Sequence, residues 1–215
     1  LIKEIFMRIL LTVLLFSGLF SAPLSAAVVT NLDKPLSIVA SVGNISGVNH
    51  RAANGFILNE TSILQSATLR MFSTQGITTA NFTLDLYSAT ATKPDSLLAS
   101  FSGETNPDAS DFVYTIDNYL IEAGTEYFLV ASALNQSEGD YFVWSGTNTL
   151  TETGDGIISD VIYGSSDNGS WFGGVSSTLF SLDFTPQAAV VPEPGSLLLL
   201  ISGLFTIAGI RIRQQ

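Results

Sequence analysis

The sequence predicts an all-β fold, with a single β-sandwich or jelly-roll domain between an N-terminal signal peptide and a C-terminal transmembrane helix. Three observations predict it. Many short segments alternate apolar and polar residues with a period of two, turn-forming residues separate these segments, and no amphipathic helix is evident between them. The two longest apolar runs lie near the ends of the 215-residue chain, which leaves residues 28–187 as one domain with one core.

The N-terminal segment has the features of an export signal. Met7-Arg8 precedes the apolar run 9–20, which would reach only about 18 Å as a helix and is too short to cross a bilayer. Ser25 and Ala27 suit the −3 and −1 positions of a cleavage site, so we expect residues 1–27 to be a signal peptide cut after Ala27. An uncleaved anchor is the alternative, and whether Met7 is the true start stays open.

Ten segments of the middle domain are predicted strands. They are 37–42, 54–58, 63–72, 82–87, 97–102, 111–116, 126–132, 141–145, 157–163 and 178–184. In the fourth of them, Phe82, Leu84 and Leu86 share one face, which we expect to point inward. The inward residues expected in segment 63–72 are Ile63, Ala67, Leu69 and Met71.

Turn signals separate these segments. They are Thr92-Lys93-Pro94-Asp95, Asn106-Pro107-Asp108, Ala123-Gly124-Thr125, Gly154-Asp155-Gly156 and Asp167-Asn168-Gly169. Many short strands joined by such turns favour a sandwich or a jelly roll. The sequence has no evident repeat at a fixed period, which argues against a propeller or a solenoid.

The C-terminal segment, 188–215, has the features of a second targeting signal. Residues 195–210 contain no charge and reach about 24 Å as a helix, at the short end for a membrane span. Arg211 and Arg213 follow the run and favour a cytoplasmic end. Pro192 and Pro194 disfavour helix just before it, which leaves an extended segment. A plain tail anchor is one interpretation of this pattern.

A resemblance supports a sharper interpretation. Pro192-Glu193-Pro194, a short apolar helix and a basic end with Arg211 and Arg213 together resemble the PEP-CTERM sorting signal. The resemblance implies recognition of the Pro-Glu-Pro motif by an exosortase, a multi-pass membrane cysteine protease or transpeptidase. It also implies removal of the tail and passage to the cell surface or extracellular matrix, in Gram-negative bacteria that make exopolysaccharide.

The middle domain resembles a second family. The residues that carry the resemblance are Asn54-Gly55-Phe56, Leu69-Arg70-Met71, Phe82 to Ser88, Lys93 to Ala99 and Leu120 to Val130. They are similar to the choice-of-anchor R domain, over most of residues 50–185. This resemblance implies a β-sandwich at the cell surface and no known activity.

Composition excludes several function classes. The net charge of −11 argues against binding nucleic acid, and the absence of cysteine excludes disulfides, thiol catalysis and zinc ribbons. His50 is the only histidine and has no nucleophile-elbow motif nearby, so we interpret it as a loop or strand-edge residue. The closest acidic pairs lie in or beside turns and are interpreted as solvated residues: Asp108 with Asp111, Glu138 with Asp140, and Asp155 with Asp160.

Calcium is the one cofactor that the sequence leaves open. Residues 28–191 contain 17 acidic and 4 basic residues, a net charge of −13, and oxygen ligands in turns suit Ca²⁺. Asp155-Gly156 and Asp167 to Ser170 resemble fragments of such a site, but no complete calcium loop exists. The alternative is that the acidity keeps an exported protein soluble.

Aromatic side chains are the candidates for stacking on a sugar ring. The aromatic residues considered are Tyr141, Trp144, Trp171 and Phe172, with Trp144 and Trp171 preferred. Trp171 and Phe172 are expected on a loop, and packing within the sandwich is the competing role for both tryptophans.

These observations lead to one expectation and one alternative. We expect a non-enzymatic protein that is exported through the translocon, cut by signal peptidase, anchored in the inner membrane, processed by an exosortase and placed in the envelope or biofilm matrix. The alternative is a carbohydrate-binding module, calcium-assisted or not, with exopolysaccharide as its partner. A hydrolase is a third, weaker hypothesis.

Overall fold

The computed structural model describes residues 26–76, 80–149, 151–166 and 170–187, and this part of the chain is all-β. The strands are β1 (Ala27–Thr30), β2 (Ile38–Ile45), β3 (Val48–Leu58), β4 (Ser62–Gln75), β5 (Thr83–Thr90), β6 (Lys93–Ser100), β7 (Asp111–Ile121), β8 (Glu126–Ser132), β9 (Tyr141–Thr147), β10 (Thr153–Gly154), β11 (Gly156–Ser166), β12 (Ser170–Val175), β13 (Ser177–Thr178) and β14 (Phe180–Pro186). None of these described segments forms a helix that is long and apolar enough to cross a membrane.

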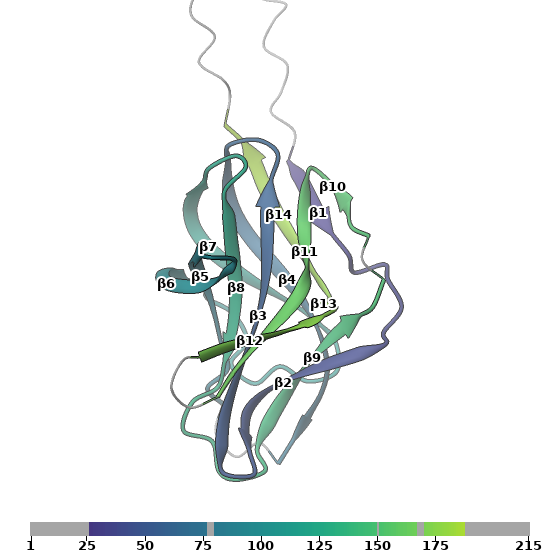
Figure 1. Ribbon diagram of the computed structural model, residues 1–215, viewed down its shortest axis with the longest axis vertical. Helices are drawn as coiled ribbons and strands as arrows, with labels where there is room; N and C mark the ends of the chain where they lie inside the picture. Colours follow the sequence, from purple (N-terminus) through teal and green to yellow (C-terminus); the bar gives the residue numbers. More distant parts are fainter. Residues whose placement is uncertain (1–25, 77–79, 150, 167–169, 188–215) are drawn as a thin grey trace, which may run out of the picture.

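The strands form two facing layers joined by one long strand (Figure 1). The first layer has the order β10-β1-β14-β4-β7, and the second contains β6, β5, β8, β3, β11 and β12. β4 links them, because residues 62–70 pair with β7 in the first layer and residues 71–75 pair with β9. A register shift between Met71 and Ser73 bends β4 at this crossing, as β-bulges do. β2 connects β9 back to β3 in the second layer.

The main core lies between the layers. It takes side chains from both, including Leu182 and Phe184 of β14 and Leu84, Leu86 and Leu129 of the second layer. The predicted inward face of segment 82–87 is confirmed, since Phe82, Leu84 and Leu86 are all buried. Their burial adds to the apolar stabilisation that the whole core provides.

The predicted inward face of segment 63–72 is wrong at its start. Leu64, not Ile63, enters the core, while Ala67, Leu69 and Met71 are buried as expected. The pairing of β4 with β7 shifts register between Leu64 and Ser66, so one extra residue interrupts the alternation. A bulge of this kind reverses the face of every residue before it.

A second cluster covers the outer face of the second layer. Ala53, Phe128, Val130 and Tyr163 are buried there, with Trp171 packed partly against them. β8 is therefore covered on both faces, which explains why Tyr127 to Ser132 are all buried. The β11–β12 hairpin supplies the cover on this side (Figure 1).

Two buried asparagines fix β13 between the layers. Asn54 Oδ1 accepts hydrogen bonds from the backbone N of Thr178 at 2.6 Å, Thr178 Oγ1 at 3.0 Å and Ser177 Oγ at 2.9 Å. Asn54 Nδ2 donates to the carbonyl of Ser159 at 2.9 Å. Asn31 donates to Ser177 Oγ and to the carbonyl of Thr178, and accepts from the backbone N of Phe180. We refer to Asn31, Asn54, Ser177 and Thr178 as the asparagine network.

The predicted turn at Thr92-Lys93-Pro94-Asp95 lies too far along the chain. The turn residues are Ala91 and Thr92, with φ of 49° and 63°, and β6 begins at Lys93. Two consecutive left-handed residues are the geometry of a tight hairpin turn. Pro94 is compatible with β6 because, among the described strands, β6 pairs only with β5 and lies at a sheet edge.

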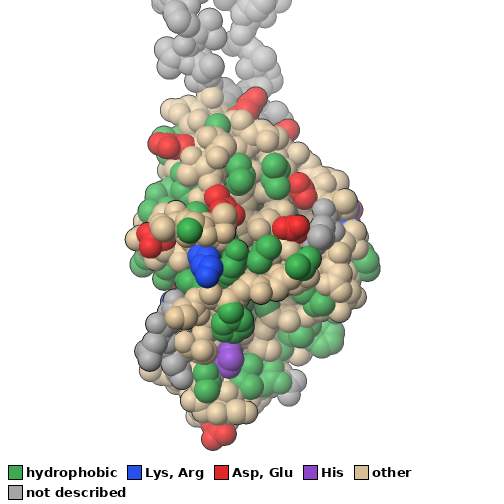
Figure 2. Space-filling model, viewed as in Figure 1, with side chains coloured by type: hydrophobic (Ala, Val, Ile, Leu, Met, Phe, Trp, Pro, Cys, Tyr) green, Lys and Arg blue, Asp and Glu red, His purple; other side chains and the backbone are tan. Residues whose placement is uncertain are grey.

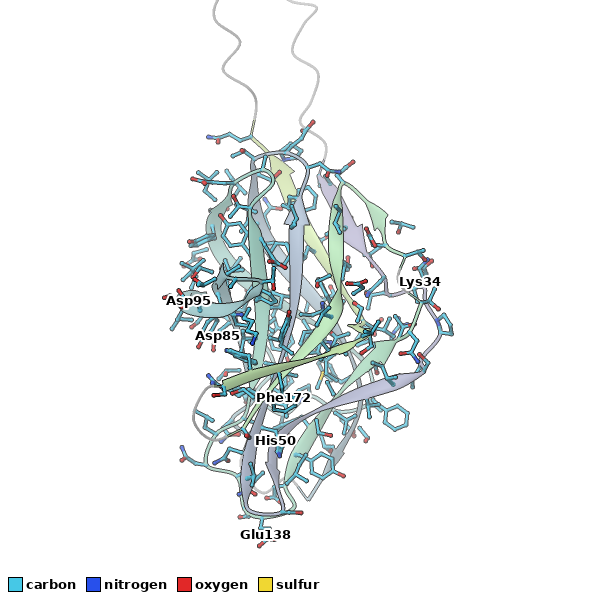
Figure 3. The ribbon with its side chains drawn as sticks, viewed as in Figure 1. Lys34, His50, Asp85, Asp95, Glu138 and Phe172 are labelled. Carbon is cyan, nitrogen blue, oxygen red and sulfur yellow. The ribbon has the colours of Figure 1, made fainter. Side chains whose placement is uncertain are left out.

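Both ends of the described domain lie at one pole. β1 pairs antiparallel with β14, with Ala27 opposite Phe184, so the chain enters and leaves side by side (Figure 1). The β2–β3 hairpin and the loop with Glu138 lie at the other pole (Figure 3). We call these the terminal pole and the distal pole.

Candidate functional site

A groove between β2 and the β11–β12 hairpin is the best candidate for a binding site. It has a cavity volume of about 340 Å³, within the usual range for small-ligand sites. Residues 38–41 of β2 form one wall, and Phe172 with its neighbours in β12 forms the other. His50 of β3 also lines the cavity, near Phe172 (Figure 3). We call it the β2–β12 groove.

Phe172 is held in place by a glycine opposite it. Gly164 of β11 pairs with Phe172, and a methyl group on Gly164 would lie 2.8 Å from Cε2 of the ring. The ring therefore lies against the Gly164 backbone, in space that any other residue would fill. Even so, 58% of the Phe172 surface is exposed, which leaves a ring face for a ligand.

The chemistry of the groove differs from that of the whole chain. Its charged or titratable lining residues are His50, Arg51 and Tyr163, and none of the described carboxylates lines it, although the domain is strongly acidic. His50 lies among hydrophobic side chains on this face (Figure 2). Such a surface suits a neutral or acidic ligand with an apolar ring face better than it suits a cation.

A second cavity has the opposite character. It has a volume of about 370 Å³ and is lined by Glu126, Glu152 and Asp160 together with apolar residues. Burial raises the pKa of the Glu126 carboxyl above its ordinary value. Within the described ranges, no three histidine, aspartate or glutamate side chains are arranged to hold a metal ion.

The acidic residues that the sequence offered as calcium fragments or acidic pairs lie in different settings. Asp155 is an exposed residue between β10 and β11, while Asp167 to Gly169 lie outside the described residues. Arg70 donates from Nε to Asp111 Oδ1 at 2.7 Å and from Nη2 to Asp111 Oδ2 at 2.8 Å. This pairing lowers the pKa of Asp111 and occupies its carboxylate.

The two preferred tryptophans are not exposed platforms. Trp144 has no exposed surface, and its Nε1 donates to the carbonyl of Leu179 at 3.0 Å. The prediction of Trp144 as a ligand residue is therefore wrong, and Trp144 is a core residue. Trp171 lies on β12, not on a loop. Its ring packs on the outer cluster, with the Arg51 guanidinium 5.0 Å from the ring centroid.

The remaining predicted site residues lie at or beyond the ends. Ala27 is the first residue of β1, so cleavage after it would leave Val28 to Thr30 paired with β14. The sorting motif Pro192-Glu193-Pro194, the apolar run 195–210 and the basic end with Arg211 and Arg213 lie outside the described residues, as does most of the signal peptide.

Sequence reasoning considered Phe172 but missed the groove. The interpretation of His50 as a loop or strand-edge residue is wrong, because His50 lies in β3 with Gly43 of β2 and Ser166 of β11 as partners. The β11–β12 hairpin brings it to Phe172 across more than a hundred residues. The glycines in β11 and β12 were the available signal, because isolated strand glycines mark close approach. No protein-family model matches the chain, and no curated protein matches it either.

Proposed function

We propose that this protein is exported, sorted to the cell surface and released into the envelope or matrix as a non-enzymatic β-domain. The pairing of β1 with β14 is the observation that carries the proposal, because it brings both ends to the terminal pole. A membrane span following β14 would hold the domain by this pole and direct the distal pole away from the bilayer. The β2–β12 groove is then accessible while the chain is still anchored.

The position of the sorting motif fits this arrangement. Gln187 is the last described residue, and four residues of chain separate it from Pro192, so the five Cα-to-Cα steps reach at most about 18 Å. A membrane protease acting at the motif would therefore work close to the terminal pole without unfolding β14. The motif's resemblance to PEP-CTERM signals makes an exosortase the proposed enzyme.

A triple substitution tests the sorting step. Replacing Pro192-Glu193-Pro194 with three alanines should leave the chain in the inner-membrane fraction, whereas the natural chain reaches the surface or medium. The matched control replaces Gln214 and Gln215 with alanine, which changes the tail but not the motif. If the natural chain and the motif variant were distributed equally between the inner membrane and the surface or medium, the C-terminal segment would be a plain anchor and not a sorting signal.

The exposed ring of Phe172 in a groove without carboxylates favours carbohydrate binding as a second function. One sugar ring would stack on Phe172 while His50 supplies a hydrogen bond. Stacking on an aromatic ring contributes about 0.5–1.5 kcal/mol, so Phe172→Ala should weaken binding to the host's polysaccharide by up to about tenfold. Titration calorimetry measures the effect, with and without a calcium chelator.

Phe72→Ala is the control for that titration. Phe72 is 49% exposed on β4 and does not line the groove, so its removal deletes a comparable exposed ring elsewhere. Equal losses from Phe72→Ala and Phe172→Ala would contradict a specific site in the groove. Loss of binding after chelation alone would indicate calcium assistance.

A further inference from the structure

The free edge of β12 lacks the features that protect other sheet edges. Among strands of the described chain that pair with one neighbour, β10 and β13 have two residues each. β6 carries Lys93, Pro94 and Asp95, and β7 carries Asp111 and Asp117. β12 has six residues, no charge, no proline and an unshifted register with β11. Unprotected edges of this kind pair with other strands.

The exposed side chains of β12 add an apolar component. Val175 is 77% exposed, the highest value among the large hydrophobic residues of the described chain, and Phe172 is also exposed. Neither residue has a side chain from another element across the free edge of β12 in any strand pairing. The outward backbone groups of β12 and these side chains form one surface, which we call the β12 edge.

We propose that the β12 edge pairs antiparallel with the β12 edge of a second copy of this chain. In an antiparallel pair, opposed residues point to the same side of the sheet. A two-fold axis therefore requires one residue to face its own counterpart. With Gly173 on the axis, Phe172 lies opposite Gly174 of the second copy, and Trp171 lies opposite Val175 of the second copy.

The glycines of the hairpin select this register. A methyl group on Gly173 would contact Val161 at 2.8 Å and Tyr163 at 3.0 Å, so the space over Gly173 is filled. A methyl group on Gly174 would have nothing within 4 Å. The ring of Phe172 from a second copy therefore fits opposite Gly174, whereas a register that sets Trp171 opposite Gly173 meets Tyr163.

Self-complementarity identifies the second copy as the partner. The register pairs an aromatic residue with a glycine on one face, and an aromatic with a β-branched residue on the other, a favourable cross-strand pair. The edge itself is uncharged, so the net negative charge of each domain opposes association only at longer range, where salt screens it. This pairing does not depend on sorting, but Phe172 and Gly174 also line the β2–β12 groove, so a second copy and a sugar would compete for the same ring.

Sedimentation equilibrium of the full chain in a mild detergent tests the proposal. The natural chain should form dimers as concentration rises, and Val175→Lys should raise the dimer dissociation constant about tenfold or more, because an edge lysine must be desolvated against Trp171. Leu97→Lys is the matched control, since Leu97 is 55% exposed on the protected edge β6. It should leave the constant unchanged.

A spin label on Val175→Cys tests the register. With Gly173 on the axis, the two labelled positions lie four residues apart along paired strands, about 14 Å between Cα atoms. Dipolar broadening at this range, absent after dilution with unlabelled chain, supports the pairing. A monomer at all concentrations, an unchanged constant for Val175→Lys, or a dimer without broadening would each overturn it.

Discussion

Single polar residues inside the core decide how the two layers meet. The asparagine network satisfies a backbone N–H, a backbone carbonyl and two hydroxyls around the fully buried Asn54. Ser177 Oγ also bonds to Asn31 and to the carbonyl of Thr178, but the other groups would lose the partner that Asn54 provides, and a buried group left without a partner costs about 1–3 kcal/mol. The network therefore fixes the position of β13 more firmly than apolar packing alone.

Asn54→Ala should lower the free energy of unfolding by about 3–5 kcal/mol, because it leaves several buried groups unsatisfied. Urea denaturation measures the loss. The control is Asn59→Ala at an exposed position next to β3, where a change within about 0.5 kcal/mol is expected. A loss below about 1 kcal/mol for Asn54→Ala would show that the network does not hold the layers together.

Asp85 gives the domain a pH-dependent element. It lies on β5 opposite Val130, and burial raises its pKa above the ordinary 3.8, with a hydrogen bond from Ser100 acting in the other direction. The folded state therefore keeps this proton to higher pH than the unfolded state. Stability falls as pH rises through the interval between the two pKa values, and the full cost is present at neutral pH.

Asp85→Asn should therefore be more stable than the natural chain at pH 7, and the difference should shrink as the pH falls below 3.8. Thermal unfolding across a pH series measures it. Asp95→Asn reports the effect of removing one exposed charge from the adjacent β6 (Figure 3). If the Asp85→Asn variant were no more stable than the natural chain at pH 7, the raised pKa of Asp85 would be contradicted.

Residue roles were harder to predict than residue burial. Trp144 and Trp171 are equally good candidates on composition, but Trp144 points between the layers and Trp171 points outward beside Arg51. The alternation in Tyr141 to Trp144 identifies two faces without saying which one is covered. Only the pairing of β9 with β2 and β4 decides this, and it comes from distant segments.

At the level of elements, the alternation pattern predicted where strands occur but not how they end. Every predicted strand overlaps a described strand, and 126–132 matches β8 fully. β1, β10 and β12 were not predicted, because they are short or glycine-rich and exist through their partners. The predicted segment 178–184 merged Thr178 of β13 with β14. The bulges in β4 were also missed, since no particular residue type marks the extra residue of a bulge.

Close approach between β2 and β9 depends on Gly43. Its φ is +132°, and a methyl group there would lie 2.7 Å from the carbonyl oxygen of Asp140 and 2.8 Å from Cα of Tyr141. Gly43→Ala should therefore cost about 4 kcal/mol or more, since backbone atoms cannot move aside cheaply. Chemical denaturation measures this loss.

Gly47→Ala separates strain from overlap. Gly47 also has a positive φ, +82°, but a methyl group there meets nothing within 4 Å. Left-handed backbone alone costs an alanine about 1–2 kcal/mol, so this change should be the milder of the two. Equal losses at both positions would show that the β2–β9 approach is looser than the distances indicate.

The whole molecule combines a rigid domain with two ends at one pole. The sequence predicted the all-β class, because alternation and turn residues are local signals. The β2–β12 groove and the β12 edge could not be predicted in the same way. They form where strands from opposite ends of the domain meet, with β11 linking β3 to β12.

The proposed export and processing predict where the mature chain begins and ends. Signal peptidase should leave Val28 as the first residue, still within β1, and the exosortase should remove the apolar run after the Pro192-Glu193-Pro194 motif. The processed chain keeps every described strand except for one residue of β1, so processing should not lower its stability measurably.

Intact mass of the protein isolated from the surface or medium of its natural host tests this account most directly. The account predicts a chain that begins at Val28 and ends within or beside Pro192-Glu193-Pro194, with any added group attached at that end. A mass that includes residues 195–215 in the surface-exposed protein would contradict it.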